Sequence, residues 1–380
     1  MSELSSAIPT RTPIKLWLPP EPKAAPTIAL MPHTLTSGPE SGLCNQIYAL
    51  VGWTVIATIH KTALVLPNWT THDRGGTSVT FDHLWEAEPF IARLRALTHV
   101  HAYQSVDALP SGMTVWRPTP REGGAIAGWR KYKSMHHVGA NISAHERAVF
   151  LGLTPSRRLR ARISAVQRAL LRPASSVDAD ASGALSRGTR TPVYGCLHAR
   201  IETDMLASWG LNRAGLPPTL DDFLSAMASV PHLRRLDVVF VAVGLAISEA
   251  DDAVLDQPTR WGARLVRTRE GKAWHRGHRN ASQPSYIDAA IVDFAVCREA
   301  AWLVGWPGTT FGRTLAALQW YDHGRGWYEV CPGPSIRLID RYDLHKECVE
   351  NNATRGAALH RGGGAAARGD GSRGNASRAG

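Results

Sequence analysis

The 380-residue chain lacks several patterns that would assign a function directly. No apolar run reaches the length of a membrane span, so we expect no membrane span. Residues 1–20 contain no continuous apolar segment of the kind found in a signal peptide, and whether the start is complete stays open. The five cysteines form no CxxC pair and show no metal-type spacing. No internal repeat is visible.

A dense lysine run is also missing, although the formal net charge is +11. Residues 353–380 hold five arginines against one aspartate, a net of +4, in a Gly/Ala/Arg/Ser stretch that we expect to be disordered. The remaining +7 is spread along the body of the chain. This distribution suits an anionic nucleotide or an acidic acceptor better than a nucleic acid, for which the chain carries no recognised motif.

The cysteines and the sequons do not decide the cellular compartment of the protein. Cys196 and Cys297 lie in apolar runs, which predicts small core residues. Cys331 and Cys348 are candidates to pair in an oxidising compartment, and the sequence does not decide this. Short sequons suggest the secretory route but arise often by chance. They begin at Asn68, Asn141, Asn280, Asn352 and Asn375.

Two successive strand–helix sets predict the fold. After a loose, Pro-rich segment 1–26, a strand at 27–31, a glycine loop, a helix at about 45–60 and a strand at 63–66 form a βαβ unit. Residues 173–190 are the best candidate for a linker, and a second set begins at Val193. It comprises strands at 193–197, 236–243, 264–267 and 301–305. Of its four helices, one starts at Thr219, one starts at Ser248, one ends near Glu299 and one spans about 311–319.

The sequence therefore predicts an α/β fold with two Rossmann-like domains that face each other across a cleft. We expect the first domain at 27–185, the second at 190–348 and the disordered tail at 353–380.

The most informative segment runs from Cys196 to Asp204. A buried strand is predicted to end in His198 and Arg200, followed by Glu202 and Asp204, and in extended geometry these four polar groups point to one side. A fixed cation beside an imidazole and two carboxylates suits a diphosphate group. Taken alone, Arg200 is more simply an ion-paired structural arginine and His198 a satisfied core histidine.

Each half also has a strand-to-helix turn suited to a ligand. Gly42 and Asn45 open the first helix, where free N–H groups favour anions or sugar oxygens. The simpler interpretation is a glycine turn with Asn45 as the N-cap. Thr309 and Thr310 open a later helix, either as a diphosphate site or as ordinary caps. Asp293 sits on a mostly apolar helix and faces either a base or ribose, or solvent.

Several segments, in order, resemble the GDP-fucose protein O-fucosyltransferase family, especially its plant and algal members. The order and spacing of these blocks carry the resemblance, which spans about residues 28–319. Ser41 replaces the first glycine of the family loop, Ile47 an arginine and Ala199 a leucine. The matching segments are Ser41–Gln46, Thr62–Pro67, Phe81–Trp85, Pro89–Ile91, His198–Ala207, and Asp293–Val296 with Gly305 and Thr309–Phe311.

The resemblance implies a GT-B fold and donor contacts. Arg200 would stabilise the departing β-phosphate of GDP, and His198 would support the nucleotide and the geometry of Arg200. Asp293 would face the guanine or ribose. Other roles that the resemblance implies are a phosphate cradle from Thr309, Thr310 and Phe311, and a sugar-side wall from Gly42 and Asn45.

The expected activity is inverting transfer of fucose from GDP-fucose to a hydroxyl, with serine or threonine of a protein as the first choice of acceptor. The general base stays open between Glu202 and Asp204. The resemblance implies that no metal is needed, and the only DxD, at 178–180, lies in the predicted linker and does not argue for one. The alternatives are another GDP-sugar, a glycan acceptor, or a relative that only binds nucleotide-sugar or glycan. By resemblance the compartment is the lumen of the endoplasmic reticulum or Golgi, with the cytoplasm as the alternative.

Overall fold

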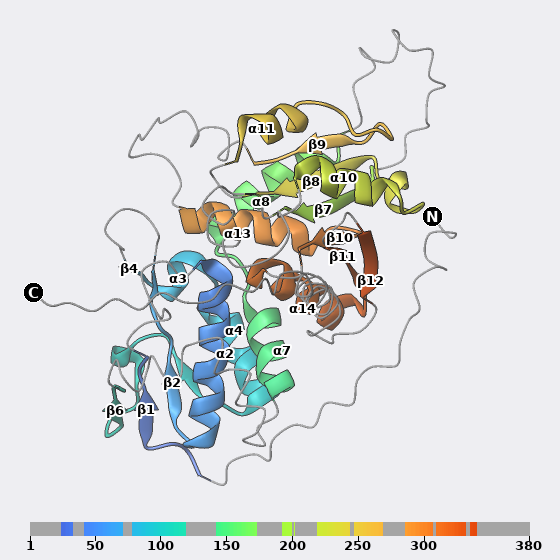
Figure 1. Ribbon diagram of the computed structural model, residues 1–380. Helices are drawn as coiled ribbons and strands as arrows, with labels where there is room; N and C mark the ends of the chain where they lie inside the picture. The colour runs from blue at the N-terminus through green and yellow to red at the C-terminus, as the bar shows by residue number, and fades with distance from the viewer. Residues whose placement is uncertain are drawn as a thin grey trace, which may run out of the picture.

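The computed structural model shows two α/β lobes that meet along helices α2 (Leu43–Ile59), α13 (Tyr286–Arg298) and α14 (Thr310–His323) (Figure 1). The residues that it describes are 24–32, 42–70, 78–118, 142–172, 192–199, 201, 219–243, 247–268, 286–306, 309–331 and 335–339. Most of the predicted loose start, and all of the linker with its DxD and the tail, lie outside these residues.

The first sheet is entirely parallel and has the order β5-β2-β1-β6. Its strands are β1 (Ile28–Leu30), β2 (Ala63–Val65), β5 (Ala102–Tyr103) and β6 (Thr114–Trp116). The chain begins at β1, adds β2 and β5 on one side, and then crosses to add β6 on the other. This reversal beside β1 makes a topological switch point.

Helix α2 (Leu43–Ile59) is buried on almost every face, and all but three of its 17 residues are buried. The wide apolar stripe in the sequence predicted this. One of its buried polar side chains has two backbone partners: Gln46 donates to the carbonyl of Thr70 and accepts from the N–H of Thr70, both at 2.9 Å. Gln46 thereby satisfies the backbone N–H and carbonyl groups of Thr70, in the segment that follows β2.

The rest of the first lobe was not predicted from the sequence. It contains the antiparallel pair β3 (Trp69–Thr70) and β4 (Ser78–Val79), and helices α3 (Phe81–Leu84), α4 (Ala87–Thr98), η1 (Val106–Ala108) and α7 (Ile142–Gly152). Helix α8 (Arg157–Leu170) follows in the chain and packs against α13 of the second lobe.

The second sheet has the order β12-β11-β10-β7-β8-β9, with only β12 antiparallel. The chain enters at the central strand β7, adds β8 and β9 on one side, and then crosses to β10, β11 and β12 on the other. This is the strand order of a Rossmann fold, with its switch point between β7 and β10. The bounds are β7 (Tyr194–His198), β8 (Val238–Ala242), β9 (Arg264–Val266), β10 (Leu303–Gly305), β11 (Trp327–Cys331) and β12 (Ser335–Ile339).

The helices of this lobe begin where side chains cap them. Thr219 and Asp222 form the predicted capping box of α10 (Leu220–Ala228). Ser248 accepts the N–H of Asp251 and caps α11 (Glu249–Leu255), again as predicted. The remaining helices are η3 (Leu233–Arg235), α13 (Tyr286–Arg298) and α14 (Thr310–His323). The predicted α/β fold with two Rossmann-like sheets is confirmed.

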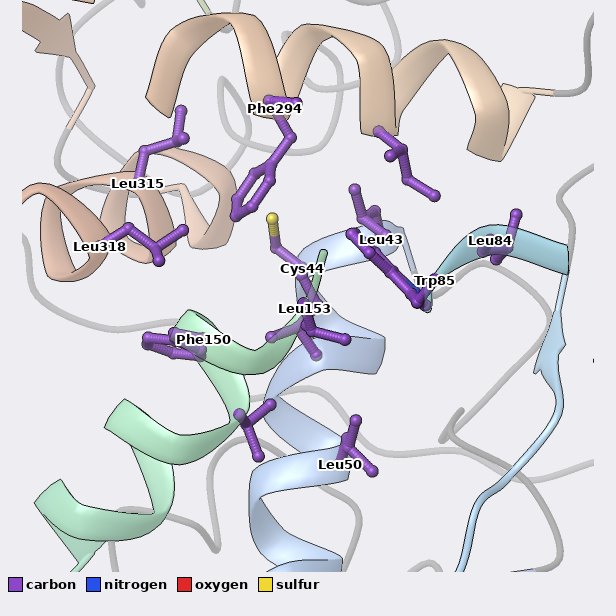
Figure 2. Close-up of a cluster of buried hydrophobic side chains, with 14 of the residues drawn as sticks. Leu43, Cys44, Leu50, Leu84, Trp85, Phe150, Leu153, Phe294, Leu315 and Leu318 are labelled. Carbon is purple, nitrogen blue, oxygen red and sulfur yellow. The ribbon is translucent and has the colours of Figure 1, made fainter. Parts of the chain in front are cut away.

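One hydrophobic core passes through both lobes. It contains side chains from α2, α7, α13, α14 and one face of β7. Figure 2 shows Cys44 of α2 with its sulfur directed toward Phe294 of α13, above Phe150 of α7. A hydrogen bond crosses the same boundary, since the partly buried Tyr321 of α14 donates to the buried Glu146 of α7 at 2.9 Å. Burial and the nearby Glu146 carboxylate raise the pKa of Tyr321.

Cys196 and Cys297 form a disulfide, which corrects the prediction that they are simply small core residues. Both are fully buried, and the bond joins β7 to α13 across 101 residues of chain. The phenol of Tyr194 adds a second link by donating to the carbonyl of Val296 at 3.0 Å. Cys348 and the side chain of Cys331 lie outside the described residues, so their pairing stays open.

At its N-terminal end, α13 is tied to α8. Arg158 binds Asp288 through both carboxylate oxygens, at 2.6 and 2.7 Å, and the Asp288 side chain is only 5% exposed. This hydrogen-bonded ion pair raises the pKa of Arg158.

Among the described residues, no helix has the length and apolar character needed to cross a membrane.

Candidate functional site

The predicted site residues of the second lobe gather where β7 and β10 end. His198 is the last residue of β7 and lies beside Gly305, the last residue of β10, and Ala242, the last residue of β8. In parallel sheets, ligands bind outside the carboxyl ends of the strands at the switch point. The structure therefore places His198 at the position in this sheet that is best suited to a nucleotide.

His198 is held from two sides. Its ring stacks on Phe311 with a centroid distance of 4.6 Å and an interplanar angle of 23°, and its Nδ1 lies 3.3 Å from Oγ1 of Thr309. Phe294 of α13 contacts Phe311 edge-on, with centroids 5.7 Å apart. Only 4% of His198 is exposed. The expectation of a satisfied core histidine fits these contacts, and so does a histidine fixed in orientation beside a ligand.

The start of α14 lies close against His198 because residue 312 is glycine. A Cβ on Gly312 would stand 2.9 Å from Oγ1 of Thr309 and 3.5 Å from Nδ1 of His198. Sequence reasoning did not single out Gly312, although it follows the Thr309–Phe311 motif directly. The close approach brings the N-terminal end of α14, where the helix dipole is positive, to the carboxyl edge of the sheet.

The two threonines of this turn have different positions. Thr309 is 94% buried and caps α14, since its Oγ1 accepts the N–H of Gly312 at 3.1 Å and also contacts the Trp306 carbonyl at 3.2 Å. Thr310 is the first helical residue and is only partly buried. The capping prediction for Thr309 is confirmed. A phosphate at this turn would meet the first-turn N–H groups and Thr310 before it met the Thr309 hydroxyl.

Asp293 lies on α13 directly before Phe294 and is partly buried. Cys297, one turn further along α13, is joined to Cys196, which precedes His198 by two residues. The disulfide thus ties the helix that carries Asp293 and Phe294 to the strand that carries His198. Sequence reasoning missed this link because pairing depends on which segments the fold brings together.

The first lobe contributes the start of α2. Gly42 is the N-cap, without a side-chain cap bond, so the interpretation of Asn45 as the N-cap is wrong: Asn45 is the third helical residue. The Oδ1 atom of Asn45 is buried, and among the described residues nothing donates a hydrogen bond to it. Among the described residues, no atom lies within 4 Å of a Cβ placed on Gly42. Uncapped N–H groups, an amide oxygen and open space at Gly42 suit a polar ligand such as a sugar.

Both helix starts lie along the same boundary between the lobes. Leu43 and Cys44 of the first turn of α2 share the core with Phe294 of α13 and Leu315 of α14 (Figure 2). The arrangement brings the two predicted ligand turns, one from each lobe, toward a common region.

Three predicted residues, Arg200, Glu202 and Asp204, lie outside the described residues. Their described neighbours Ala199 and Ile201 are buried in the core on the other face of the second sheet. The roles predicted for the three charged residues stay predictions. Among the described residues, no group of three His, Cys, Asp or Glu side chains is placed to hold a metal ion.

Comparison with known proteins gives structural likeness only. No family model matches the chain, and no curated protein matches its sequence. Solved structures of similar shape include POFUT1 in complex with GDP, with 10% identity, 78% of this chain and 95% of that chain covered, and a TM-score of 0.48. NodZ α-1,6-fucosyltransferase soaked with GDP-fucose shows 15% identity, covers 83% of this chain and 99% of its own, and has a TM-score of 0.48. Fucosyltransferase NodZ from Bradyrhizobium shows 14% identity, with 84% of this chain and 100% of that chain covered and a TM-score of 0.45.

Proposed function

We propose that the chain is a GT-B-type glycosyltransferase that transfers fucose from GDP-fucose to a hydroxyl, with inversion. The observation that carries the proposal is the placement of His198, Phe311 and the start of α14 at the switch point of a Rossmann-ordered sheet. In such sheets this edge binds nucleotides, with the diphosphate at a helix N-terminus. The matching motifs of the O-fucosyltransferases supply the identity of the nucleotide and sugar.

In the proposed complex, the diphosphate lies against the first turn of α14, where backbone N–H groups and Thr310 donate to it. Phe311 and His198 form the wall of the nucleotide pocket, and Asp293 accepts hydrogen bonds from the guanine or ribose. Arg200 donates to the β-phosphate and stabilises the charge that develops as GDP departs. Fixed protein dipoles and a guanidinium supply this stabilisation, so the proposal needs no metal.

The reaction is a single displacement. The acceptor oxygen forms a bond to the anomeric carbon as the bond from that carbon to the β-phosphate oxygen breaks, and GDP leaves with the bonding electron pair. The acceptor proton passes to a base, for which Glu202 and Asp204 are the candidates. Asn45 and Gly42, at the start of α2, orient the sugar and the acceptor hydroxyl from the first lobe.

We propose the secretory pathway as the compartment. The Cys196–Cys297 disulfide supports this, because disulfides persist in oxidising compartments and are rare in the cytosol. The proposed acceptor is a serine or threonine hydroxyl of a protein.

The test is a donor-screened transfer assay on purified chain. GDP release and sugar transfer are followed with GDP-fucose and GDP-mannose, each with a panel of folded protein domains and free glycans. We expect acceptor-dependent GDP release from GDP-fucose only. Release only from GDP-mannose would replace the donor, transfer only to glycans would replace the acceptor, and binding without release under any condition would leave a nucleotide-sugar-binding protein.

A further inference from the structure

Tyr194, Cys196 and His198 form a row along one face of β7, since alternate residues of a strand share a face. Each of the three contacts a helix that covers this face. Tyr194 donates to the carbonyl of Val296, Cys196 is bonded to Cys297, and His198 stacks on Phe311 of α14. The disulfide is therefore the middle contact in a row that ends in the candidate nucleotide site.

The same bond lies close to the site on α13. Cys297 is one helical turn from Asp293 and three residues from Phe294, whose ring meets Phe311 edge-on at 5.7 Å. Phe311 in turn stacks on His198. The side chains thus form a closed circuit: β7, the disulfide, α13, Phe294, Phe311 and back to His198. Of the three side-chain contacts in this circuit, only the disulfide is covalent.

We propose that the Cys196–Cys297 disulfide is a positioning element of the nucleotide site, and that its formation is the maturation step that makes the chain competent to bind a guanosine diphosphate. The inference rests on the proposed function for the identity of the ligand. Without the bond, α13 is held on β7 by the Tyr194 hydrogen bond and by non-directional packing, which fix its height and rotation less tightly.

The bond must form during folding rather than switch in the finished protein. Both cysteines are 0% exposed, so no soluble thiol or disulfide reaches them in the native state. In the maturation step, the thiols of Cys196 and Cys297 lose two protons and two electrons. A low-molecular-weight disulfide such as glutathione disulfide takes these up and becomes two thiols, by exchange through a mixed disulfide.

The experiment compares full-length chain refolded from the reduced, unfolded state with and without glutathione disulfide. Peptide mapping without reduction checks the Cys196–Cys297 link, and calorimetry measures the Kd for GDP. We expect the oxidised chain to bind GDP about tenfold or more tightly than the reduced chain, which is the loss seen at metal sites when a contact that orients a metal ligand is removed. Adding the oxidant during a second refolding of the reduced chain should restore the affinity.

Variants separate positioning from stability. Cys196→Ala/Cys297→Ala should bind GDP as weakly as reduced chain and should not respond to the oxidant. Arg158→Ala breaks the link at the other end of α13, so it should lower the melting temperature while changing the Kd for GDP by less than about twofold. Cys44→Ala, at a buried cysteine outside the disulfide, should respond to the oxidant like the natural chain.

Hydrogen exchange gives a readout that needs no ligand. Backbone amides at 290–298 and 309–312 should exchange faster in reduced chain than in oxidised chain. If the double alanine variant does not fold, Cys196→Val/Cys297→Ala, which leaves less empty volume, replaces it. Equal GDP affinity and equal exchange with and without the bond would overturn the proposal, as would mapping that finds both thiols reduced after oxidative refolding. An oxidised chain that shows the exchange difference but does not bind GDP would overturn the proposed function alone.

Discussion

Gly312→Ala tests whether the start of α14 must lie as close to His198 as the structure shows. The added methyl would be 2.9 Å from Oγ1 of Thr309 and 3.5 Å from the ring of Trp327, so the capping turn must shift. Overpacking of this kind costs about 1–3 kcal/mol, and a weakened N-cap adds about 1 kcal/mol. The better helix propensity of alanine returns about 1 kcal/mol. The net expectation is a loss of about 1–3 kcal/mol.

Gly42→Ala is the matched control, because the same methyl on Gly42 would meet no atom of the described part of the chain within 4 Å. The backbone there, with φ −56° and ψ 168°, accepts alanine, and the cost is at most about 1 kcal/mol of capping. If Gly42 lines the sugar side, this variant should lose transfer activity while its melting temperature falls by at most about 2 °C and its affinity for GDP is unchanged.

Differential scanning calorimetry and GDP titration separate the two variants. If the two lobes melt as one unit, about 1–3 kcal/mol corresponds to a melting temperature roughly 1–5 °C lower for Gly312→Ala, and its GDP affinity should fall as well. The reasoning would be refuted if Gly312→Ala kept both values of the natural chain, or if Gly42→Ala lost as much stability as Gly312→Ala.

Three further predictions concern the site and its support. Arg200→Ala should lower turnover by about 100-fold or more, since a lost charge contact in the transition state costs this much; near-normal steady-state transfer would remove its role. Burial raises the pKa of Tyr194 from 10.0, its value in the unfolded chain, to about 12. The contribution of the neutral phenol to the stability of the folded protein is therefore complete below pH 10 and is lost as the pH rises to about 12. Tyr194→Phe should therefore be about 1 kcal/mol less stable at pH 8 in urea unfolding, and should lose less stability than the natural chain between pH 10 and 12. Thr309→Ser should keep the cap and the contact with His198, whereas Thr309→Val should lose about 1–2 kcal/mol and weaken GDP binding; identical titrations for the two variants would contradict the role given to the hydroxyl.

The sequence predicted those elements whose signals are local. Short continuous apolar runs located β7, β8 and β10, and the Thr219 and Ser248 caps located the starts of α10 and α11, because these signals depend on neighbouring residues alone. Helix α8 was missed because its many arginines hide a narrow apolar stripe whose buried residues include Leu159, Ile163 and Leu170.

The candidate site was predictable only in part for the same reason. His198 and Phe311 were each singled out by motif, but their stacking joins residues 113 positions apart and depends on the order of strands in the sheet. The disulfide likewise follows from the packing of α13 on β7, which no local pattern encodes. Asn45 was placed at the cap because a polar residue after glycine commonly caps a helix, whereas here the apolar Leu43 and Cys44 are pulled into the shared core and α2 starts two residues earlier.

The core that passes between the lobes has a consequence for how the molecule opens. Cys44, Phe294 and Leu315 are buried against one another, and the hydrogen bond from Tyr321 to Glu146 crosses the same boundary. A hinge motion that separated the lobes would expose these apolar side chains and break the hydrogen bond from the Tyr321 phenol to the buried Glu146 carboxylate. Opening of the two lobes as rigid bodies is therefore energetically disfavoured. The two Rossmann-like halves should behave as one thermodynamic body and melt in a single calorimetric transition.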